Sequence, residues 1–330
     1  MDSYLITGGA GYIGSHLVER LINKKKKVIV YDNLSTGSML LLKKKVKFIK
    51  GDINNYKKLS QVLIKHKINT IFHFAAAINV AEAEINKKKY YKNNINGTKN
   101  LIKAINVSKL KVKNIIFASS CTVYGGAKNS ITEESKIKPA GYYGYTKAIS
   151  EKNIINFSNS IGCNYAILRY FNVAGASNSG NIGEINSKNG HLFKNIAIQS
   201  HKKIRKVYIN GKNFKTRDGT CVRDYIHVVD LTDIHLKVLS YLNKKNKSLI
   251  LNCGYGRGYS VLEIVNQASK IISNLYILFT KKRIGDVNSA FCSNKKIKKI
   301  LNWKPKNNNI KLMLTSAINW EKKLFNLKQK

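Results

Sequence analysis

Proline and acidic residues are scarce in this sequence, whereas lysine is abundant. The 330 residues include 2 prolines, and 17 acidic residues stand against 59 lysines and arginines, which gives a formal net charge of +42 at pH 7. Such a charge is typical of proteins that bind nucleic acids or anionic surfaces. Here the lysines come with many asparagines and isoleucines, the residues that AT-rich codons encode, and the lysine runs at 24–27, 43–45 and 87–89 lack interleaved aromatic residues. We therefore predict a solvated basic surface and no nucleic-acid partner.

Long hydrophobic runs are also lacking, and the few cysteines are scattered. No apolar run approaches the roughly 20 residues that a membrane helix needs. The N-terminal segment MDSYLITGGAG enters a strand pattern directly, without the basic and apolar parts of a signal peptide. The 5 cysteines form no C-x-x-C pair, which suits reduced thiols and argues against a zinc site. The sequence thus predicts a cytoplasmic protein without a membrane partner.

Strand-like and helix-like segments alternate through the first half of the chain. Between most of the strand-like runs, apolar residues recur with helical spacing. This alternation predicts an α/β fold built on a Rossmann-type, doubly wound parallel sheet with right-handed crossovers. The strand-like runs lie at 4–7, 27–32, 46–52, 70–76, 114–120 and 165–172.

The alternating pattern loosens after about Val173, where glycine and asparagine become frequent. We predict that residues 1–171 form the sheet domain and that residues 172–330 form a smaller mixed α/β domain over its carboxyl edge. Residues 222–253 are expected to return in part to the first domain.

Gly8, Gly11 and Gly14 lie three residues apart between the first strand and the first helix. Glycines so placed allow a tight turn, a close approach of the backbone to a pyrophosphate, and close packing of helix on strand, while the free N–H groups of the helix bind phosphate. Asp32 ends the second strand, 18 residues after Gly14. A carboxylate there binds a ribose 2′-hydroxyl and repels a 2′-phosphate. The first domain is therefore predicted to bind NAD rather than NADP.

The segment GYYGYTK at 141–147 crowds three tyrosines ahead of one lysine. Only Tyr143 lies four positions before Lys147, so only these two share a helix face, and Tyr142 and Tyr145 point elsewhere. A phenol with a pKa of ~10 is a poor base at neutral pH. We expect the ammonium of Lys147 to lower the pKa of Tyr143 toward the working range. The pair predicts an acid/base role for Tyr143.

A series of motifs runs in order from end to end of the chain: TGGAGYIGSH, YDNLSTG, HFAA, YYKNNINGT, SSCTVYG, YGYTK, RYFN and DGTCVRDYIHVVDL. Together they resemble the extended short-chain dehydrogenase/reductases, and most of all the UDP-hexose 4-epimerases among them. RYFN followed by DGTCVRDYIHV is the combination that favours the epimerases. The resemblance implies that UDP-galactose and UDP-glucose are interconverted through a transient 4-keto sugar. It also implies tightly bound NAD, which takes hydride from C4 and returns it to the opposite face.

The resemblance implies roles for individual residues of the cofactor site. The three glycines contact the pyrophosphate, Asp32 the adenosine ribose, and Asp52 with Ile53 the adenine. The expected cofactor contacts are Gly8, Gly11, Tyr12, Ile13, Gly14, Asp32, Asn33, Asp52, Ile53, Phe74, Ala75, Ala76, Asn93, Tyr143, Lys147 and Phe171.

The resemblance likewise implies the catalytic and substrate-binding residues. Tyr143 is the acid/base, Lys147 tunes it and holds the nicotinamide ribose, and Ser120 contacts the sugar hydroxyls. Arginines in the second domain pair with the UDP diphosphate, since a guanidinium binds phosphate in bidentate fashion. The expected substrate contacts are Ser120, Thr122, Tyr143, Asn172, Leu192, Arg223, Arg283, Asp286 and Ala290.

Sugar size is the least constrained property. By the same resemblance Ala290 lines the sugar pocket, and its small side chain leaves room for a 2-acetamido group, so UDP-N-acetylhexosamines are expected as further substrates. In the alternative, Phe291 fills the space and Ala290 only packs. Val173 and Lys194 stand where many relatives have proline, which leaves loop geometry and sugar preference open.

Other functions stay open at this stage. A different NAD-dependent nucleotide-sugar epimerase or a decarboxylase of the same family fits most of the motifs. A 4,6-dehydratase needs an acidic pair after Ser120, where Cys121 and Thr122 stand. A non-catalytic dinucleotide sensor is disfavoured because its Tyr/Lys pair would be broken.

Three histidines and the oligomeric state complete the sequence-based expectations. His73, His191 and His227 are dispersed without ligand spacing, so we expect structural hydrogen bonds and no metal. The resemblance implies a homodimer that pairs the helix after Tyr143 with the helix around Asn93–Val107 in a four-helix bundle.

Overall fold

The computed structural model describes residues 2–43, 45–126, 130–186 and 190–329. Its largest element is a seven-stranded sheet with the strand order β10-β6-β5-β4-β1-β2-β3, and every neighbouring pair in it is parallel. The predicted doubly wound parallel sheet is confirmed. Its strands are β1 (Ser3–Thr7), β2 (Lys27–Asp32), β3 (Lys47–Lys50), β4 (Thr70–His73), β5 (Asn114–Ser120), β6 (Asn164–Tyr170) and β10 (Leu249–Cys253).

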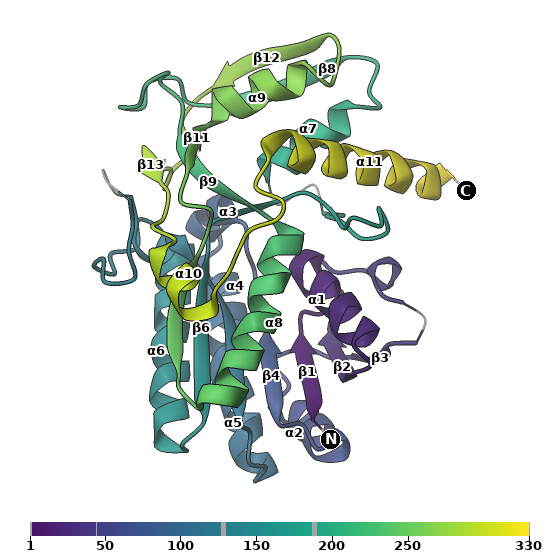
Figure 1. Cartoon of the computed structure of the whole chain (residues 1–330), viewed down its shortest axis with the longest axis vertical. Helices are drawn as coiled ribbons and strands as arrows, with labels where there is room; N and C mark the ends of the chain where they lie inside the picture. The colour runs from purple at the N-terminus through teal and green to yellow at the C-terminus, as the bar shows by residue number, and fades with distance from the viewer. Residues whose placement is uncertain (1, 44, 127–129, 187–189, 330) are drawn as a thin grey trace.

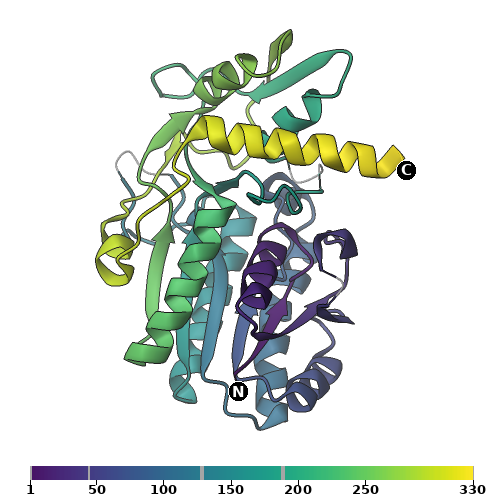
Figure 2. The same cartoon turned by 45° about the vertical axis from the view of Figure 1, so that its right-hand side comes forward.

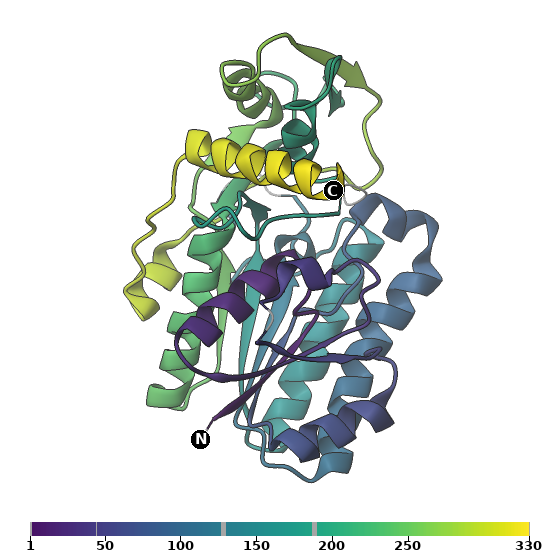
Figure 3. The same ribbon diagram turned by 90° about the vertical axis from the view of Figure 1, so that its right-hand side faces the viewer.

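Helices cover both faces of this sheet because successive side chains of a strand point to opposite faces. In β1, Ile6 packs into one apolar core and Leu5 into another. The core of Ile6 includes residues of α1 (Tyr12–Asn23) and α8 (Val228–Lys245). The core of Leu5 includes residues of α2 (Tyr56–His66), α5 (Gly97–Ser108) and α6 (Tyr142–Ser160). Figure 3 shows the two helical layers edge-on, with the sheet between them.

Three sequence-predicted strands end earlier than expected, all at the carboxyl edge, and one of them is the run at 70–76, which ends at His73. The run at 165–172 is divided at Phe171, whose N–H donates to the Cys253 carbonyl at 3.1 Å. Asn172 then begins β7 (Asn172–Ala174), which leaves the sheet to pair with β9 (Val222–His227). The run at 46–52 ends as a strand at Lys50.

The remaining elements form a smaller layer over the carboxyl ends of the strands (Figures 1 and 2). β11 (Gly258–Ser260) and β13 (Ser289–Ala290) flank β9, and β7 also pairs with β9. A parallel pair, β8 (Arg205–Asn210) and β12 (Leu275–Thr280), lies farther out. The helices of this part are α7 (Leu192–Gln199), α9 (Val261–Ser269) and α11 (Ile310–Gln329), whereas α10 (Lys295–Leu301) packs against β10 and α8.

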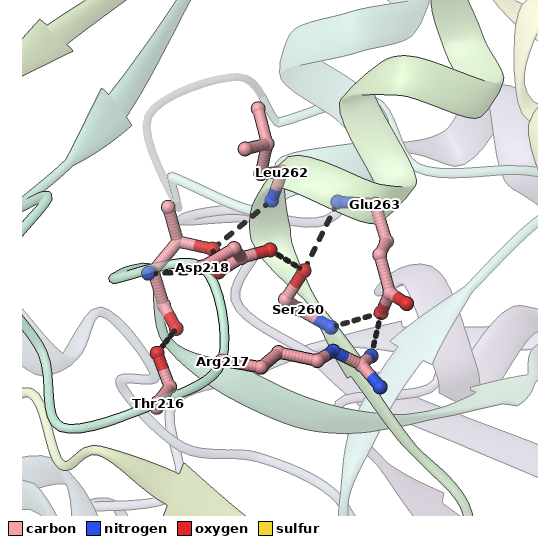
Figure 4. A network of polar contacts seen from close by, with 7 residues as sticks. Thr216, Arg217, Asp218, Ser260, Leu262 and Glu263 are labelled. Atoms are coloured by element: carbon pink, nitrogen blue, oxygen red, sulfur yellow. Dashed lines mark hydrogen bonds and ion pairs between the residues drawn. The ribbon is translucent and has the colours of Figure 1, made fainter.

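Polar contacts tie the loop before β9 to the start of α9 (Figure 4). Ser260 caps α9, and its hydroxyl also donates to Asp218. The Leu262 N–H donates to Thr220 Oγ1 at 3.2 Å, and Arg217 pairs with Glu263. These contacts fix the loop before β9 against the N-terminus of α9.

Short helices lie in the segments that connect the longer elements. They are η1 (Met39–Leu41), α3 (Val80–Ile85), α4 (Lys87–Tyr90), the π-helix η2 (Tyr91–Asn96) and η3 (Cys121–Val123). Within the described residues, we find no helix with the length and apolar character needed to span a bilayer.

Candidate active site

A cleft of about 720 Å³ lies between the sheet and the smaller layer. It is lined from the sheet side by the turns that follow β1, β2, β4 and β5, and from the other side by β9, β13 and the 283–287 segment. Ligand sites of doubly wound sheets lie at the carboxyl ends of the strands. Every residue that the sequence analysis expected to contact cofactor or substrate lines this one cleft.

The glycine-rich turn after β1 leaves no space for a side chain at Gly8 or Gly14. Gly8 has φ +72°, and a Cβ added to it would lie 2.6 Å from the Ala75 nitrogen. A Cβ on Gly14 would lie 2.4 Å from the Gly8 oxygen. The turn thus exposes backbone N–H groups at the N-terminus of α1, where an anion is stabilised. This cradle fits the pyrophosphate of a dinucleotide.

Asp32 closes the next part of the cleft at the end of β2. Its carboxylate accepts hydrogen bonds from the Ala10 N–H at 3.0 Å and from the Leu34 N–H at 2.8 Å. Burial raises the pKa of Asp32 and these two bonds lower it, with a net increase. The neighbouring Asp52 accepts from Asn33 Nδ2 at 3.0 Å. The Asp32 carboxylate fits the hydroxyls of a ribose, and Asp52 lines the cleft beside it.

Tyr143 is the one tyrosine of the GYYGYTK segment that lines the cleft. It lies in the first turn of α6, whose Tyr142 N–H donates to Glu84 Oε1 at 2.6 Å. The Tyr143 ring is buried and packs edge-on against Tyr90, with 6.4 Å between ring centroids. Tyr145 is 47% exposed. The helix therefore directs a single phenol into the cleft.

Lys147 lies one turn after Tyr143 and is also buried. Its Nζ atom donates to the Ala118 carbonyl at 2.7 Å and lies 6.0 Å from the centroid of the Tyr143 ring. Burial lowers the pKa of Lys147 to about 7, although the charge of Glu151 raises it. The ammonium is thus close to the phenol without a direct hydrogen bond between them.

The expected decrease in the pKa of Tyr143 is wrong for this structure. Burial raises the pKa of Tyr143 above its ordinary value, Cys121 raises it further, and the hydrogen bond with Ser120 lowers it. Burial disfavours the charged phenolate more than the hydrogen bond with Ser120 favours it. Burial of the Tyr143 ring therefore shifts its pKa in the direction opposite to the one that helical spacing alone predicts.

Ser120 ends β5 beside this pair and continues into η3. Its hydroxyl oxygen accepts from the Thr122 N–H at 3.3 Å and from Thr122 Oγ1 at 3.0 Å. The two hydroxyl groups thus lie together at the cleft wall, next to Tyr143. Such an arrangement suits the binding of vicinal sugar hydroxyls.

Two arginines line the opposite wall. Arg223 of β9 donates from Nη1 to the carbonyls of Val222 and Val287, both at 2.9 Å. Arg283 pairs with Asp286 at 2.9 Å, and Asp286 also lies 3.5 Å from Arg223. Two guanidinium groups share one carboxylate, so the wall keeps a net positive charge that suits a diphosphate.

Ala290 lies on β13, opposite Arg223 of β9 in the strand register. It is 4% exposed and packs with Cys121 and Phe171. Phe291 is directed instead toward Gly258, outside the set of described residues that line the cleft. The small side chain therefore faces the pocket and the large one does not.

His73 and His227 make structural hydrogen bonds, whereas His191 lines the cleft. His73 bonds to Thr7 and Thr98 at 2.7 and 3.2 Å, and burial lowers its pKa to about 3. His227 accepts from the Val229 N–H at the start of α8. His191 lines the cleft and pairs with Glu184 at 2.5 Å. In the described ranges, no three His, Cys, Asp or Glu side chains are placed to hold a metal.

Some residues at the cleft were not found from the sequence. Residues 77–82 follow β4 and line the cleft, and their position after a parallel strand was a usable signal. Glu184, His191, Tyr208 and Asn210 also line it. Their segments carry no pattern of spacing that marks them, since only the folding of the second layer brings them there.

Comparison with known proteins gives consistent results. Residues 4–254 match the model of the NAD dependent epimerase/dehydratase family. The chain is 40% identical to a UDP-glucose 4-epimerase of Lactobacillus helveticus over 96% of each chain. The structure of UDP-glucose 4-epimerase from Bifidobacterium longum in complex with NAD+ and UDP is 33% identical, with a TM-score of 0.92 and coverage of 98% of this chain and 99% of that one. The UDP-Glc/GlcNAc 4-epimerase of Campylobacter jejuni is 35% identical, with a TM-score of 0.83 and coverage of 98% and 100%.

Proposed function

The chain belongs to the NAD-dependent epimerase/dehydratase family, and we propose that it is a UDP-glucose 4-epimerase, which interconverts UDP-galactose and UDP-glucose with tightly bound NAD. The observation that carries the proposal is the set of residues that line one cleft. It joins a pyrophosphate cradle, a buried Tyr143–Lys147 pair and two arginines on the facing wall. Relatives that share the fold and at least a third of the sequence are named for this activity.

Different residues of the cleft have different roles in the proposed reaction. As a phenolate, which the ammonium of Lys147 and the positive charge of bound NAD⁺ would stabilise, Tyr143 takes the proton of the sugar 4-hydroxyl and later returns it, while Ser120 and Thr122 orient the hydroxyl by hydrogen bonds. Arg223 and Arg283 hold the diphosphate, so that the sugar can turn about its bonds to the phosphate while the nucleotide stays bound. Bound NAD supplies a hydride acceptor and donor at C4.

The cofactor contacts follow the same geometry. Gly8, Gly11 and Gly14 hold the pyrophosphate, Asp32 the adenosine ribose, and Asp52 with Ile53 the adenine. The other proposed contacts are Tyr12, Ile13, Asn33, Phe74, Ala75, Ala76, Asn93, Lys147 and Phe171, all of which line the cleft. The proposed boundary between the domain that binds NAD and the domain that binds UDP-sugar lies at Phe171, where β6 ends and the chain bends away.

The sugar pocket supports a wider substrate range. Ala290 faces the cleft, and Phe291 does not. We extend the proposal to UDP-N-acetylglucosamine and UDP-N-acetylgalactosamine, because a methyl side chain leaves space for the acetamido group.

The proposed assembly is a homodimer in the cytoplasm. Val107 of α5 and Tyr145 of α6 are about half exposed on neighbouring helices, and a second copy of these helices would cover them. The five cysteines are free, as expected where thiols stay reduced.

The test is incubation of purified protein with UDP-galactose and, separately, with UDP-glucose, without added nucleotide, followed by sugar analysis. We expect each substrate to give the same mixture of both. Conversion only when NAD⁺ is supplied and consumed would indicate a dehydrogenase. Inertness toward both hexoses together with release of CO₂ from UDP-glucuronate would indicate a decarboxylase.

A further inference from the structure

Glu151 is a buried carboxylate directly behind the active site. It follows Lys147 by four residues on α6, so Tyr143, Lys147 and Glu151 form a ladder on one face of the helix. Its side chain is 5% exposed. The helix thus presents an acid, a cation and an anion in successive turns.

Glu151 is tied into a buried ion pair with Arg169 of β6. Arg169 Nε lies 3.0 Å from Oε1, and Nη2 lies 2.7 Å from Oε2. Arg169 Nη1 donates to the Tyr124 hydroxyl at 2.6 Å, and that hydroxyl donates to Asn252 Oδ1 at 2.9 Å. Burying such a pair yields little net stability, because desolvation offsets the attraction. Its position therefore suggests a purpose other than stability.

The end of β5 connects this pair to the catalytic groups. Three consecutive residues at this strand end, Ala118, Ser119 and Ser120, have different surroundings. The Ala118 carbonyl accepts from Lys147 Nζ, the Ser119 hydroxyl donates to Glu151 Oε1, and Ser120 faces the cleft. Lys147 and Glu151 thus bind the strand end on which Ser120 lies.

We infer that Glu151 is a positioning residue of the active site: it anchors the end of β5 through Ser119 and holds the positive charge on Lys147. The inference rests on the proposed function, because it concerns the same acid/base pair. It extends the site to a side chain that touches neither substrate nor cofactor.

The charges around Lys147 support the second part of the inference, that Glu151 stabilises the protonated form of Lys147. On α6 these are Tyr143 and Glu151, and β4 contributes His73, which is neutral at pH 7 because its pKa is about 3. From β5 the uncharged ring of Phe117 lies 4.8 Å from Nζ. The π-helix η2 contacts α6 through the amide of Asn94, and Arg169 of β6 lies beyond Glu151. Among these groups Glu151 supplies the negative charge.

Glu151→Gln tests the inference, since it keeps the size and removes the charge. Without the carboxylate the pKa of Lys147 falls below its present value, so the ammonium is lost at lower pH. We expect the alkaline limb of kcat to move by about one unit toward acid, with little change in KM for UDP-galactose. Ser119→Ala is the matched control: it removes the anchor and keeps the charge, so it should lower kcat without moving the limb.

A second readout needs no turnover. The side-chain ammonium of Lys147, identified by ¹⁵N NMR from the signal lost in Lys147→Met, should titrate about one unit lower in Glu151→Gln than in the parent protein. If the single variant fails to fold around an unpaired Arg169, the Glu151→Gln/Arg169→Gln variant removes both charges and should show a smaller shift in the same direction, because Arg169 lies farther from Lys147 than Glu151 does. A folded variant with an unmoved limb and an unmoved ammonium signal would overturn the inference. A parent protein without epimerase activity would refute the proposed function instead, and the NMR titration would still decide the role of Glu151.

Discussion

Tyr143 and Lys147 lie one turn apart on α6, with 6.0 Å between the Lys147 Nζ atom and the centroid of the Tyr143 ring. The ammonium is hydrogen-bonded to the Ala118 carbonyl instead of to the phenol. Its effect on the phenol is therefore that of a charge held in place by the strand. The two side chains should make separable contributions to catalysis.

Replacement of the phenol tests the acid/base assignment. Tyr143→Phe keeps the ring that packs against Tyr90 and removes the proton carrier, so kcat should fall by roughly 10²-fold or more while bound NAD is retained. Steady-state kinetics and cofactor content measure the two effects. Tyr145→Phe, at an exposed position of the same helix, is the control and should leave kcat nearly unchanged. Near-normal turnover in Tyr143→Phe would contradict the mechanism.

We predict that retention of the cofactor depends on Asp32. The purified protein should release close to one equivalent of NAD(H) per chain on denaturation, because the cofactor is regenerated in each cycle. Asp32→Ala removes the acceptors for the ribose hydroxyls, so the released amount should fall and discrimination against NADP should relax. Asp32→Asn keeps one acceptor and loses the charge, and it should retain more NAD than the alanine variant. Unchanged NAD content in Asp32→Ala would remove Asp32 from the ribose site.

We predict that Ala290 sets the size of the accepted sugar. Ala290→Tyr fills space that only an N-acetylated sugar uses, so conversion of UDP-N-acetylglucosamine should fall on the order of 10-fold or more, while UDP-galactose is spared. The comparison is the ratio of kcat/KM for the two substrates. Equal losses on both substrates, or a parent that does not convert the N-acetylated sugar, would show that Ala290 does not set specificity.

A buried ion pair outside the cleft should affect stability alone. Lys194 of α7 pairs with Glu321 of α11, and the two side chains are 4% and 9% exposed. Glu321→Gln leaves the lysine charge buried without its counter-ion, so the free energy of unfolding should fall by about 3 kcal/mol, as measured by urea denaturation. Glu134→Gln, from a pair with a 74% exposed carboxylate, is the surface control and should change it by less than about 1 kcal/mol. Equal effects of the two variants would mean that the Lys194–Glu321 pair is not desolvated in solution.

The local parts of the site could be predicted because their geometry is local. Gly8 and Gly14 belong to one turn and one helix start, and Tyr143 and Lys147 share one helix face. In each case a spacing of a few residues is enough to define the arrangement, since helix and turn geometry are nearly invariant.

Sequence periodicity and composition by themselves determined the class of the sheet, the cofactor turn and the choice of one tyrosine among three. Only the tertiary structure decided which side chains face them across the cleft, because Arg223, Arg283 and Ala290 arrive there from segments more than 50 residues beyond Phe171. It also decided in which direction the pKa values of Tyr143 and Lys147 shift. The pKa of Tyr143 is raised and that of Lys147 is lowered to about 7, because exclusion of water by the surrounding layers outweighs the attraction that helical spacing alone predicts.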